Sequence, residues 1–125
     1  MEFPATLKYT DTHEWISVDG DVATVGITEF AAGELGDVVF VDIPEMKAVS
    51  IGDNFGSIEA VKTVSDLVAP ISGVITEVNA ELEGTPEIVN ADPYGKGWMI
   101  RMTIGNAAEI DGLMDAAAYT ALIGK

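Results

Sequence analysis

The chain has 125 residues, a length that fits one domain with a modest core, and 48% of them are hydrophobic, which excludes a disordered acidic polymer. Asp and Glu outnumber Lys and Arg by 21 to 6, and the formal net charge of -15 argues against nucleic-acid and anionic-membrane partners. Cysteine is absent from the sequence, which excludes disulfides, thiolate metal sites and a cysteine nucleophile.

The N-terminal segment and the hydropathy of the chain predict a cytoplasmic protein. MEFPATLKY lacks both the pattern of a secretory signal and the Arg and Ser richness of a mitochondrial transit peptide. No apolar run approaches the length needed to cross a bilayer. We therefore expect a bacterial cytoplasmic protein, with a mature mitochondrial form as the alternative, and a monomer kept soluble by its charge.

Short strand-like segments separated by turn signals run along most of the chain. Their β-branched and aromatic residues, at this close spacing, predict an all-β sandwich or barrel that occupies residues 1–125 as a single domain. In chain order the segments are WISV, DVATVGI, VVFVDI, FGSIEAV, GVITEV and WMIRMTI.

Two segments depart from the strand pattern and predict helices. TEFAAGEL, residues 28–35, opens with Thr28 as a candidate N-cap and is followed by Gly36. DAAAYTALI, residues 115–123, has Asp115 as its candidate N-cap and apolar residues at helical spacing. We expect the second helix to pack on the β core.

Lys62 lies between two strand-like segments in GSIEAVKTVSDLVAP, and residues 56–69 predict a hairpin around it. An exposed lysine on a hairpin turn is ordinary, because lysine is easily left in water. A rigid hairpin would also hold such a lysine out where an enzyme can modify it.

The hairpin and four other segments together resemble one known family. GSIEAVKTVSDLVAPISGVITEVN is similar to the lipoyl-attachment segment of the glycine cleavage system H-protein family. The opening, the centre, the Asp-Pro-Tyr-Gly run and the final helix of that family are resembled in turn by KYTDTHEW, VGITEFAAGELGDVVFVDIPEMK, VNADPYGKGWMIRM and LMDAAAYTALI. The resemblance spans almost the whole chain, in order.

This resemblance implies a fold and a cofactor. The fold is a flattened β-barrel of the lipoyl/biotinyl type, a barrel-sandwich hybrid, with a short internal helix and a C-terminal helix. Lys62 is then the residue that carries lipoic acid in amide linkage. Lipoamide is a group carrier, so it would bring the sulfur chemistry that a chain without cysteine lacks.

The resemblance also implies a carrier rather than an enzyme. In the family's cycle a pyridoxal-phosphate-dependent decarboxylase passes the aminomethyl group of glycine to the lipoyl disulfide. A tetrahydrofolate-dependent aminomethyltransferase then takes the one-carbon unit, and dihydrolipoamide dehydrogenase restores the disulfide. Lipoate-attaching enzymes complete the set of partners implied for this chain.

Two acidic residues are candidates for sheltering the aminomethyl group. A nearby carboxylate favours the protonated form of an amine, and protonation removes the lone pair that would expel the sulfur. By carry-over from the family's His-Glu-Trp and Ser-Asp motifs, we expect Glu14 and Asp66 in a cleft that receives the arm. Simple solvation is the alternative role for both acids.

The remaining motifs predict structural roles. His13, the single histidine, has no paired nucleophile or metal-ligand cluster in the sequence, so we expect it to be structural or to line a cleft, and we expect no metal site. Trp15 and Trp98 fit core or cleft walls better than stacking platforms for bases. DPYGKGW has the wrong pattern for a phosphate loop and predicts a tight turn.

Three other interpretations remain open from the sequence. An H-like protein that stores or relays lipoate would use the same lysine. A lipoyl or biotinyl domain of another complex would share the hairpin, although biotinyl hairpins place Met on both sides of the lysine, where Val61 and Thr63 stand here. An acidic interaction module with an unmodified Lys62 is the third.

Overall fold

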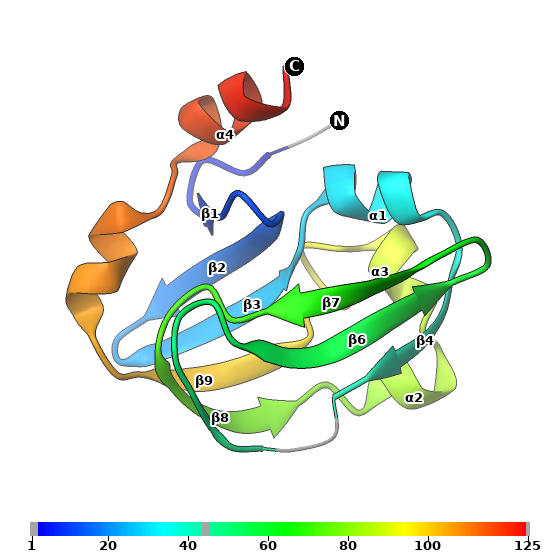
Figure 1. Cartoon of the computed structure of the whole chain (residues 1–125), viewed down its shortest axis with the longest axis horizontal. Helices are drawn as coiled ribbons and strands as arrows, with labels where there is room; N and C mark the ends of the chain where they lie inside the picture. The colour runs from blue at the N-terminus through cyan, green and yellow to red at the C-terminus, as the bar shows by residue number, and fades with distance from the viewer. Residues whose placement is uncertain (1–2, 44–45, 125) are drawn as a thin grey trace.

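A computed structural model describes residues 3–43 and 46–124, which form two β-sheets with short helices along their edges (Figure 1). The strands are β1 Lys8–Tyr9, β2 Glu14–Asp19, β3 Val22–Ile27, β4 Val38–Asp42, β5 Ala48–Val49, β6 Asn54–Ala60, β7 Val64–Val68, β8 Gly73–Val78 and β9 Ile100–Ile104. The helices are α1 Glu29–Leu35, α2 Glu81–Gly84, α3 Ile88–Ala91, the 3₁₀ helix η1 Ala107–Gly112, and α4 Ala116–Ile123.

The strands pair only with antiparallel neighbours and fall into two separate sheets. Six strands follow the order β1-β2-β3-β9-β8-β5, and three follow the order β4-β6-β7. Buried residues of both sheets form one hydrophobic cluster. The predicted β fold with short helices is therefore confirmed, with the difference that the two sheets are not closed into a barrel. The chain passes through α1 between β3 and β4, so the second sheet begins apart from the first.

The period of two along the strands decides which side chains enter the core. In β9, Ile100 and Met102 are fully buried, while Arg101 between them points out to the surface. Gly73 on the neighbouring strand β8 allows a close backbone approach, because a Cβ atom there would clash with the carbonyl oxygen of Thr103.

Both predicted helices form and have the expected N-caps. The hydroxyl of Thr28 accepts a hydrogen bond from the Ala31 amide at 3.2 Å at the start of α1. The carboxylate of Asp115 accepts one from the Ala118 amide at 2.8 Å at the start of α4. Helix α4 packs through Tyr119, which is fully buried.

Helix α4 closes over the N-terminal segment through aromatic contacts. The rings of Tyr119 and Tyr9 are stacked with their centroids 4.9 Å apart, and Phe3 meets Tyr119 edge to face. The backbone groups of Tyr9 and Met114 exchange two hydrogen bonds. Segments far apart in the sequence therefore lie together at this end of the molecule (Figure 1).

Helices α2, α3 and η1 were not predicted, because each is a single turn or little more and shows no helical periodicity. The DPYGKGW segment after α3 forms the expected turn. Its Asp92 carboxylate accepts a hydrogen bond from the Lys96 amide at 3.0 Å. The indole N–H of Trp15, a core residue as predicted, donates to the carbonyl of Pro93 at 2.9 Å.

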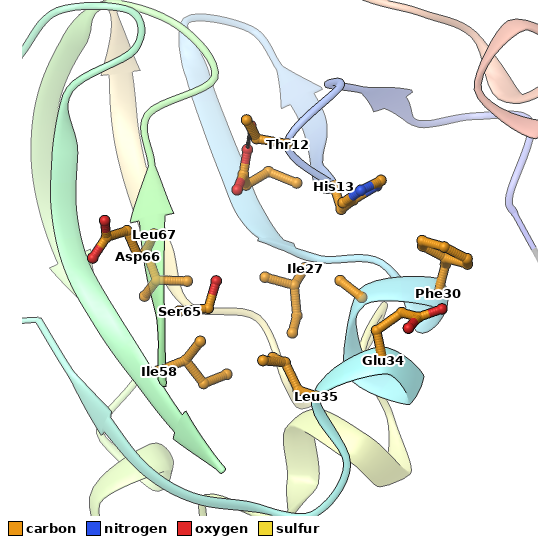
Figure 2. Close-up of a pocket in the computed structure, with 12 residues that line it drawn as sticks. Thr12, His13, Ile27, Phe30, Glu34, Leu35, Ile58, Ser65, Asp66 and Leu67 are labelled. Atoms are coloured by element: carbon orange, nitrogen blue, oxygen red, sulfur yellow. Dashed lines mark hydrogen bonds between the residues drawn. The ribbon is translucent and has the colours of Figure 1, made fainter. Parts of the chain in front are cut away.

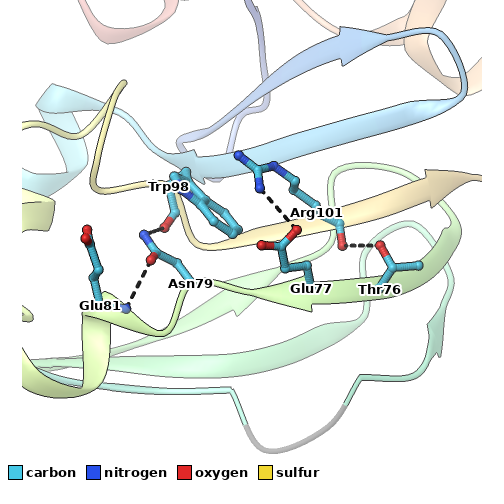
Figure 3. A network of polar contacts seen from close by, with 6 residues as sticks. All are labelled: Thr76, Glu77, Asn79, Glu81, Trp98 and Arg101. Carbon is cyan, nitrogen blue, oxygen red and sulfur yellow. Dashed lines mark hydrogen bonds and ion pairs between the residues drawn. The ribbon is translucent and has the colours of Figure 1, made fainter.

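Polar contacts fix the surface where β8 ends and β9 begins (Figure 3). The Arg101 guanidinium lies 4.1 Å from the centroid of the half-buried Trp98 ring and 3.1 Å from the carboxylate of Glu77. Asn79 donates from its amide to the carbonyls of Lys96 and Trp98, both at 2.8 Å. The Asn79 side chain therefore links the end of β8 to the segment that precedes β9.

The close approach at Gly73 predicts a position-specific loss of stability. We expect Gly73→Ala to lower the free energy of unfolding by about 2 kcal/mol, because the new methyl group forces β8 and β9 apart. Gly33→Ala is the matched control: position 33 lies in α1 with open space around it, and alanine there adds about 0.5–1 kcal/mol. Urea unfolding of the three proteins measures both effects, and an equal response at the two positions contradicts the prediction.

Candidate functional site

Lys62 lies at the exposed tip of the β6–β7 hairpin, as the sequence predicts. The turn is closed by a hydrogen bond of 2.8 Å from the Ala60 amide to the carbonyl of Thr63. A second bond of 3.0 Å, from the Val61 amide to the carbonyl of Asp37, ties the tip to the segment between α1 and β4. The backbone on both sides of Lys62 is thus fixed while its side chain remains in water.

A cleft of about 460 Å³ lies between β7 and helix α1 (Figure 2). Its walls are mostly apolar, and its polar groups gather on the turn before β2 and on β7. The lining residues are Thr12, His13, Glu14, Ile27, Phe30, Ala31, Glu34, Leu35, Ile58, Ser65, Asp66 and Leu67.

Glu14 is the buried acid of the cleft, with only 2% of its surface exposed. Its carboxylate oxygen Oε1 accepts a hydrogen bond from the hydroxyl of Thr10 at 2.7 Å and a second, short one from the hydroxyl of Thr12. Burial raises the pKa of Glu14 to about 7, against the opposing effect of these hydrogen bonds. Near neutral pH this carboxyl group is therefore ready to give up or to hold a proton.

His13 forms part of the cleft wall, and its ring contacts Tyr119, which lies outside the cleft lining. Its backbone has φ of 71°, a left-handed conformation that is uncommon outside glycine. Its ring nitrogen Nδ1 lies 2.8 Å from the hydroxyl oxygen of Tyr119, which lies 2.8 Å from the hydroxyl of Thr28. Burial lowers the pKa of His13, with the charges of Asp11 and Glu34 acting in the opposite direction.

Asp66 lines the same cleft as Glu14, from strand β7. Asp66 pairs with Ser57 across the hairpin, and its carboxylate points away from the cavity, whereas the neighbouring Ser65 points toward it (Figure 2). Successive side chains of a strand face opposite sides of a sheet, so Ser65 and Asp66 point to opposite sides of β7. Glu14, Glu34 and Asp66 all line the cleft, and Glu14 is the buried acid among them. The expected role of Asp66 in sheltering the arm stays a prediction.

Helix α1 connects the lysine tip to the cleft. A second cavity, of about 310 Å³, is lined by Val61 and Lys62 together with residues 33–37. Two residues of α1, Glu34 and Leu35, line both this cavity and the cleft. The two cavities therefore adjoin at Glu34 and Leu35, one containing Lys62 in its lining and the other Glu14.

Sequence reasoning missed the residues that define the environment of Glu14. Thr10 and Thr12 precede it by four and two residues, and the spacing alone did not show that the chain turns there and returns both hydroxyls to one carboxylate. The contribution of α1 to the cleft wall was missed because a helix prediction does not say what the helix packs against.

Comparison with known proteins relates this geometry to a family. Residues 7–125 match the sequence profile described as Glycine cleavage H-protein. The chain belongs to the glycine cleavage H-protein family. A glycine cleavage system H protein from Bacteroides fragilis is 54% identical over 124 residues, and one from Bacteroides thetaiotaomicron is 53% identical; each alignment covers 98% of both chains.

Membership of the H-protein family extends to the three-dimensional structure. The crystal structure of a glycine cleavage system H protein from Mycobacterium marinum superposes with a TM-score of 0.86 at 40% sequence identity. The superposition covers 98% of this chain and all of the other. The sequence-based resemblance to the glycine cleavage H-protein family is therefore confirmed.

In residues 3–43 and 46–124, none of the helices combines the length and the hydropathy of a membrane span. Nor do any three His, Cys, Asp or Glu side chains in the same ranges gather into a group that could hold a metal ion.

The raised pKa of Glu14 predicts a pH-dependent stability that Glu14→Gln removes. The folded protein retains the Glu14 proton up to about pH 7, whereas the ordinary pKa is 4.5, so ionisation disfavours the fold as the pH rises through this window. Relative to the Gln variant, we expect the free energy of unfolding of the wild type to fall by up to about 3 kcal/mol from pH 4.5 to 7 and then level off.

Urea unfolding of both proteins from pH 5 to pH 8 measures this difference. All other acids are common to the two proteins, so their titration cancels. A difference that stays constant over the whole range contradicts a proton held on Glu14.

Proposed function

We propose that this chain is the lipoyl-carrying shuttle of a glycine cleavage system, a carrier rather than an enzyme. It would accept the aminomethyl group of glycine from a pyridoxal-phosphate-dependent decarboxylase on lipoyl-Lys62. It would then present the group to a tetrahydrofolate-dependent aminomethyltransferase and the reduced arm to dihydrolipoamide dehydrogenase. The observation that carries this proposal is the exposed Lys62 on a cavity that adjoins the cleft of the buried Glu14, in a chain of the H-protein family.

The residues at the tip and in the cleft fit a lysine-linked lipoyl group. Lipoate-attaching enzymes can reach Lys62 without disturbing the fold, because Val61, Lys62 and Thr63 are all exposed. The apolar side chains of Ile58 and Leu35 in the cleft offer contacts for a hydrocarbon arm. When bound, the group supplies a disulfide that takes the aminomethyl carbon on one sulfur and hydrogen on the other as CO₂ leaves glycine, a two-electron reduction of the disulfide.

Glu14 is the group that would hold the cargo in a stable form. A carboxylate beside an amine favours the ammonium form, whose nitrogen has no lone pair to expel the sulfur. The hydroxyls of Thr10 and Thr12 keep the Glu14 oxygens fixed, and the apolar walls limit the water around them. In this arrangement the proton that Glu14 gives up as it ionises is replaced by the positive charge of the cargo.

The charge of the protein suits partners with basic docking surfaces. The net charge of -15 lets a basic surface attract the protein from a distance and release it as salt increases. The decarboxylase, the transferase and the dehydrogenase would each meet the same hairpin, because the arm leaves the protein at one point.

Lipoylation of Lys62 is the first test of the proposed function. Incubation with lipoate ligase, ATP and lipoate should add one lipoyl mass to the wild type and none to Lys62→Ala, as measured by intact mass spectrometry. Lys96→Ala is the control, because Lys96 is exposed on a turn outside both cavities and should leave the modification complete. Equal lipoylation of Lys62→Ala and the wild type would refute the proposal.

The lifetime of the loaded arm tests the role of Glu14. After loading from glycine by the decarboxylase, Glu14→Gln should release ammonia without the transferase about ten- to a hundredfold faster than the wild type, since hydrogen bonds to charged groups are worth about 1.5–3 kcal/mol. Asp66→Asn is the matched control, and its loaded form should be as long-lived as the wild type, because its carboxylate points out of the cleft. A loaded Glu14→Gln variant as long-lived as the wild type contradicts the assigned role of Glu14.

A further inference from the structure

The side chain of Asn90 joins three backbone groups on the connection between α1 and β4. Its amide Nδ2 donates to the carbonyl of Gly36 at 2.8 Å and lies 3.5 Å from that of Ala32. Its carbonyl Oδ1 accepts from the Val38 amide at 2.9 Å. Only this orientation of the amide satisfies both kinds of partner, since carbonyls need a donor and the N–H needs an acceptor.

The segment held by Asn90 is the one that holds the lysine tip. Asp37 stands between the two bonded residues Gly36 and Val38, and its carbonyl accepts the hydrogen bond from the Val61 amide. Val61 precedes Lys62 directly. The position of the tip relative to α1 therefore depends on residues 36–38, and these depend on Asn90.

Asn90 reaches this segment from outside the site. It lies on α3, and it lines neither the cleft nor the cavity beside Lys62. Helix α3 is anchored in turn by Val89, which is completely buried. Asn90 thus transmits the position of the core to the end of the cleft helix and to the lysine tip.

We propose that Asn90 is a positioning residue for the lipoyl arm: one side-chain amide sets where the arm leaves the protein relative to the cleft that receives it. This inference rests on the proposed function of Lys62. Without the amide, the tip and α1 move independently, and the arm reaches Glu14 in a smaller fraction of molecules.

The matched control for Asn90→Ala is Asn79→Ala. Asn79 is a buried amide that also bridges backbone segments, with its two donated bonds to Lys96 and Trp98 and an accepted bond of 3.1 Å from the Glu81 amide (Figure 3). It contacts neither α1 nor the hairpin tip through these bonds. Each variant loses the hydrogen bonds of one bridging amide. An effect seen in both variants therefore reflects a general loss of stability, whereas an effect seen only in Asn90→Ala reflects the position of the tip.

The first measurement needs no cofactor. Hydrogen exchange of backbone amides, followed by NMR on the unmodified protein, should be about tenfold faster at Val61 and Val38 in Asn90→Ala than in Asn79→Ala. Without the Asn90 side chain, local opening of this segment breaks fewer hydrogen bonds and costs less free energy. Amides of β2 and β3 should exchange alike in the two variants. Unchanged exchange at Val61 overturns the inference.

The second measurement follows the loaded arm. Lipoylated Asn90→Ala, loaded from glycine, should release ammonia without the transferase about tenfold faster than lipoylated Asn79→Ala. A tenfold ratio corresponds to weakening the binding of the arm in the cleft by the free energy of about one hydrogen bond. Asn90→Asp, which keeps the acceptor for Val38 and loses both donors, should shift in the same direction if Asn90→Ala folds poorly.

The outcomes separate this inference from the proposed function. A wild type that takes up no lipoyl mass refutes the proposed function and, with it, the role of Asn90. A lipoylated wild type, combined with equal lifetimes for Asn90→Ala and Asn79→Ala, overturns the inference about Asn90 and leaves the proposed function intact.

Discussion

Helix α1 has seven residues, too few for a helix to persist alone in water, so its place beside the cleft depends on the side chains that hold its two ends. At its start, the Thr28 hydroxyl caps the Ala31 amide and meets the hydroxyl of Tyr119, and the Glu29 amide donates to the hydroxyl of Tyr94 at 3.0 Å. At its end, Asn90 holds Gly36. The cleft wall is therefore built by residues from the last third of the chain.

The protonation state of Glu14 in the cleft also depends on a few polar contacts. Burial of Glu14 disfavours its charged form, and two threonine hydroxyls offset only part of that effect. A buried acid without a cation in reach keeps its proton more firmly than a surface acid does. Among the acidic residues in 3–43 and 46–124, Glu14 is distinguished by its burial.

Local signals in the sequence predicted what depends on local chemistry. Thr28 and Asp115 mark helix starts because N-cap bonds span three residues, and Lys62 falls at a hairpin tip because strand and turn residues alternate around it. The direction of the Asp66 side chain depends on strand register, and the hydrogen bonds of Asn90 depend on contacts between segments far apart in the sequence. No short stretch of sequence contains that information, which explains why neither the direction of the Asp66 side chain nor the contacts of Asn90 were predicted.

The contact of Tyr119 with His13 and Thr28 also sets an order of assembly during synthesis. The hairpin with Lys62 leaves the ribosome well before α4, since chains emerge from their N-terminus at about 5–20 residues per second. Until Tyr119 emerges and docks, His13 and Thr28 lack their contacts with α4, while Lys62 is already outside the ribosome. If Lys62 carries the arm as proposed, a ligase that acted on nascent chains would attach the arm before these contacts form.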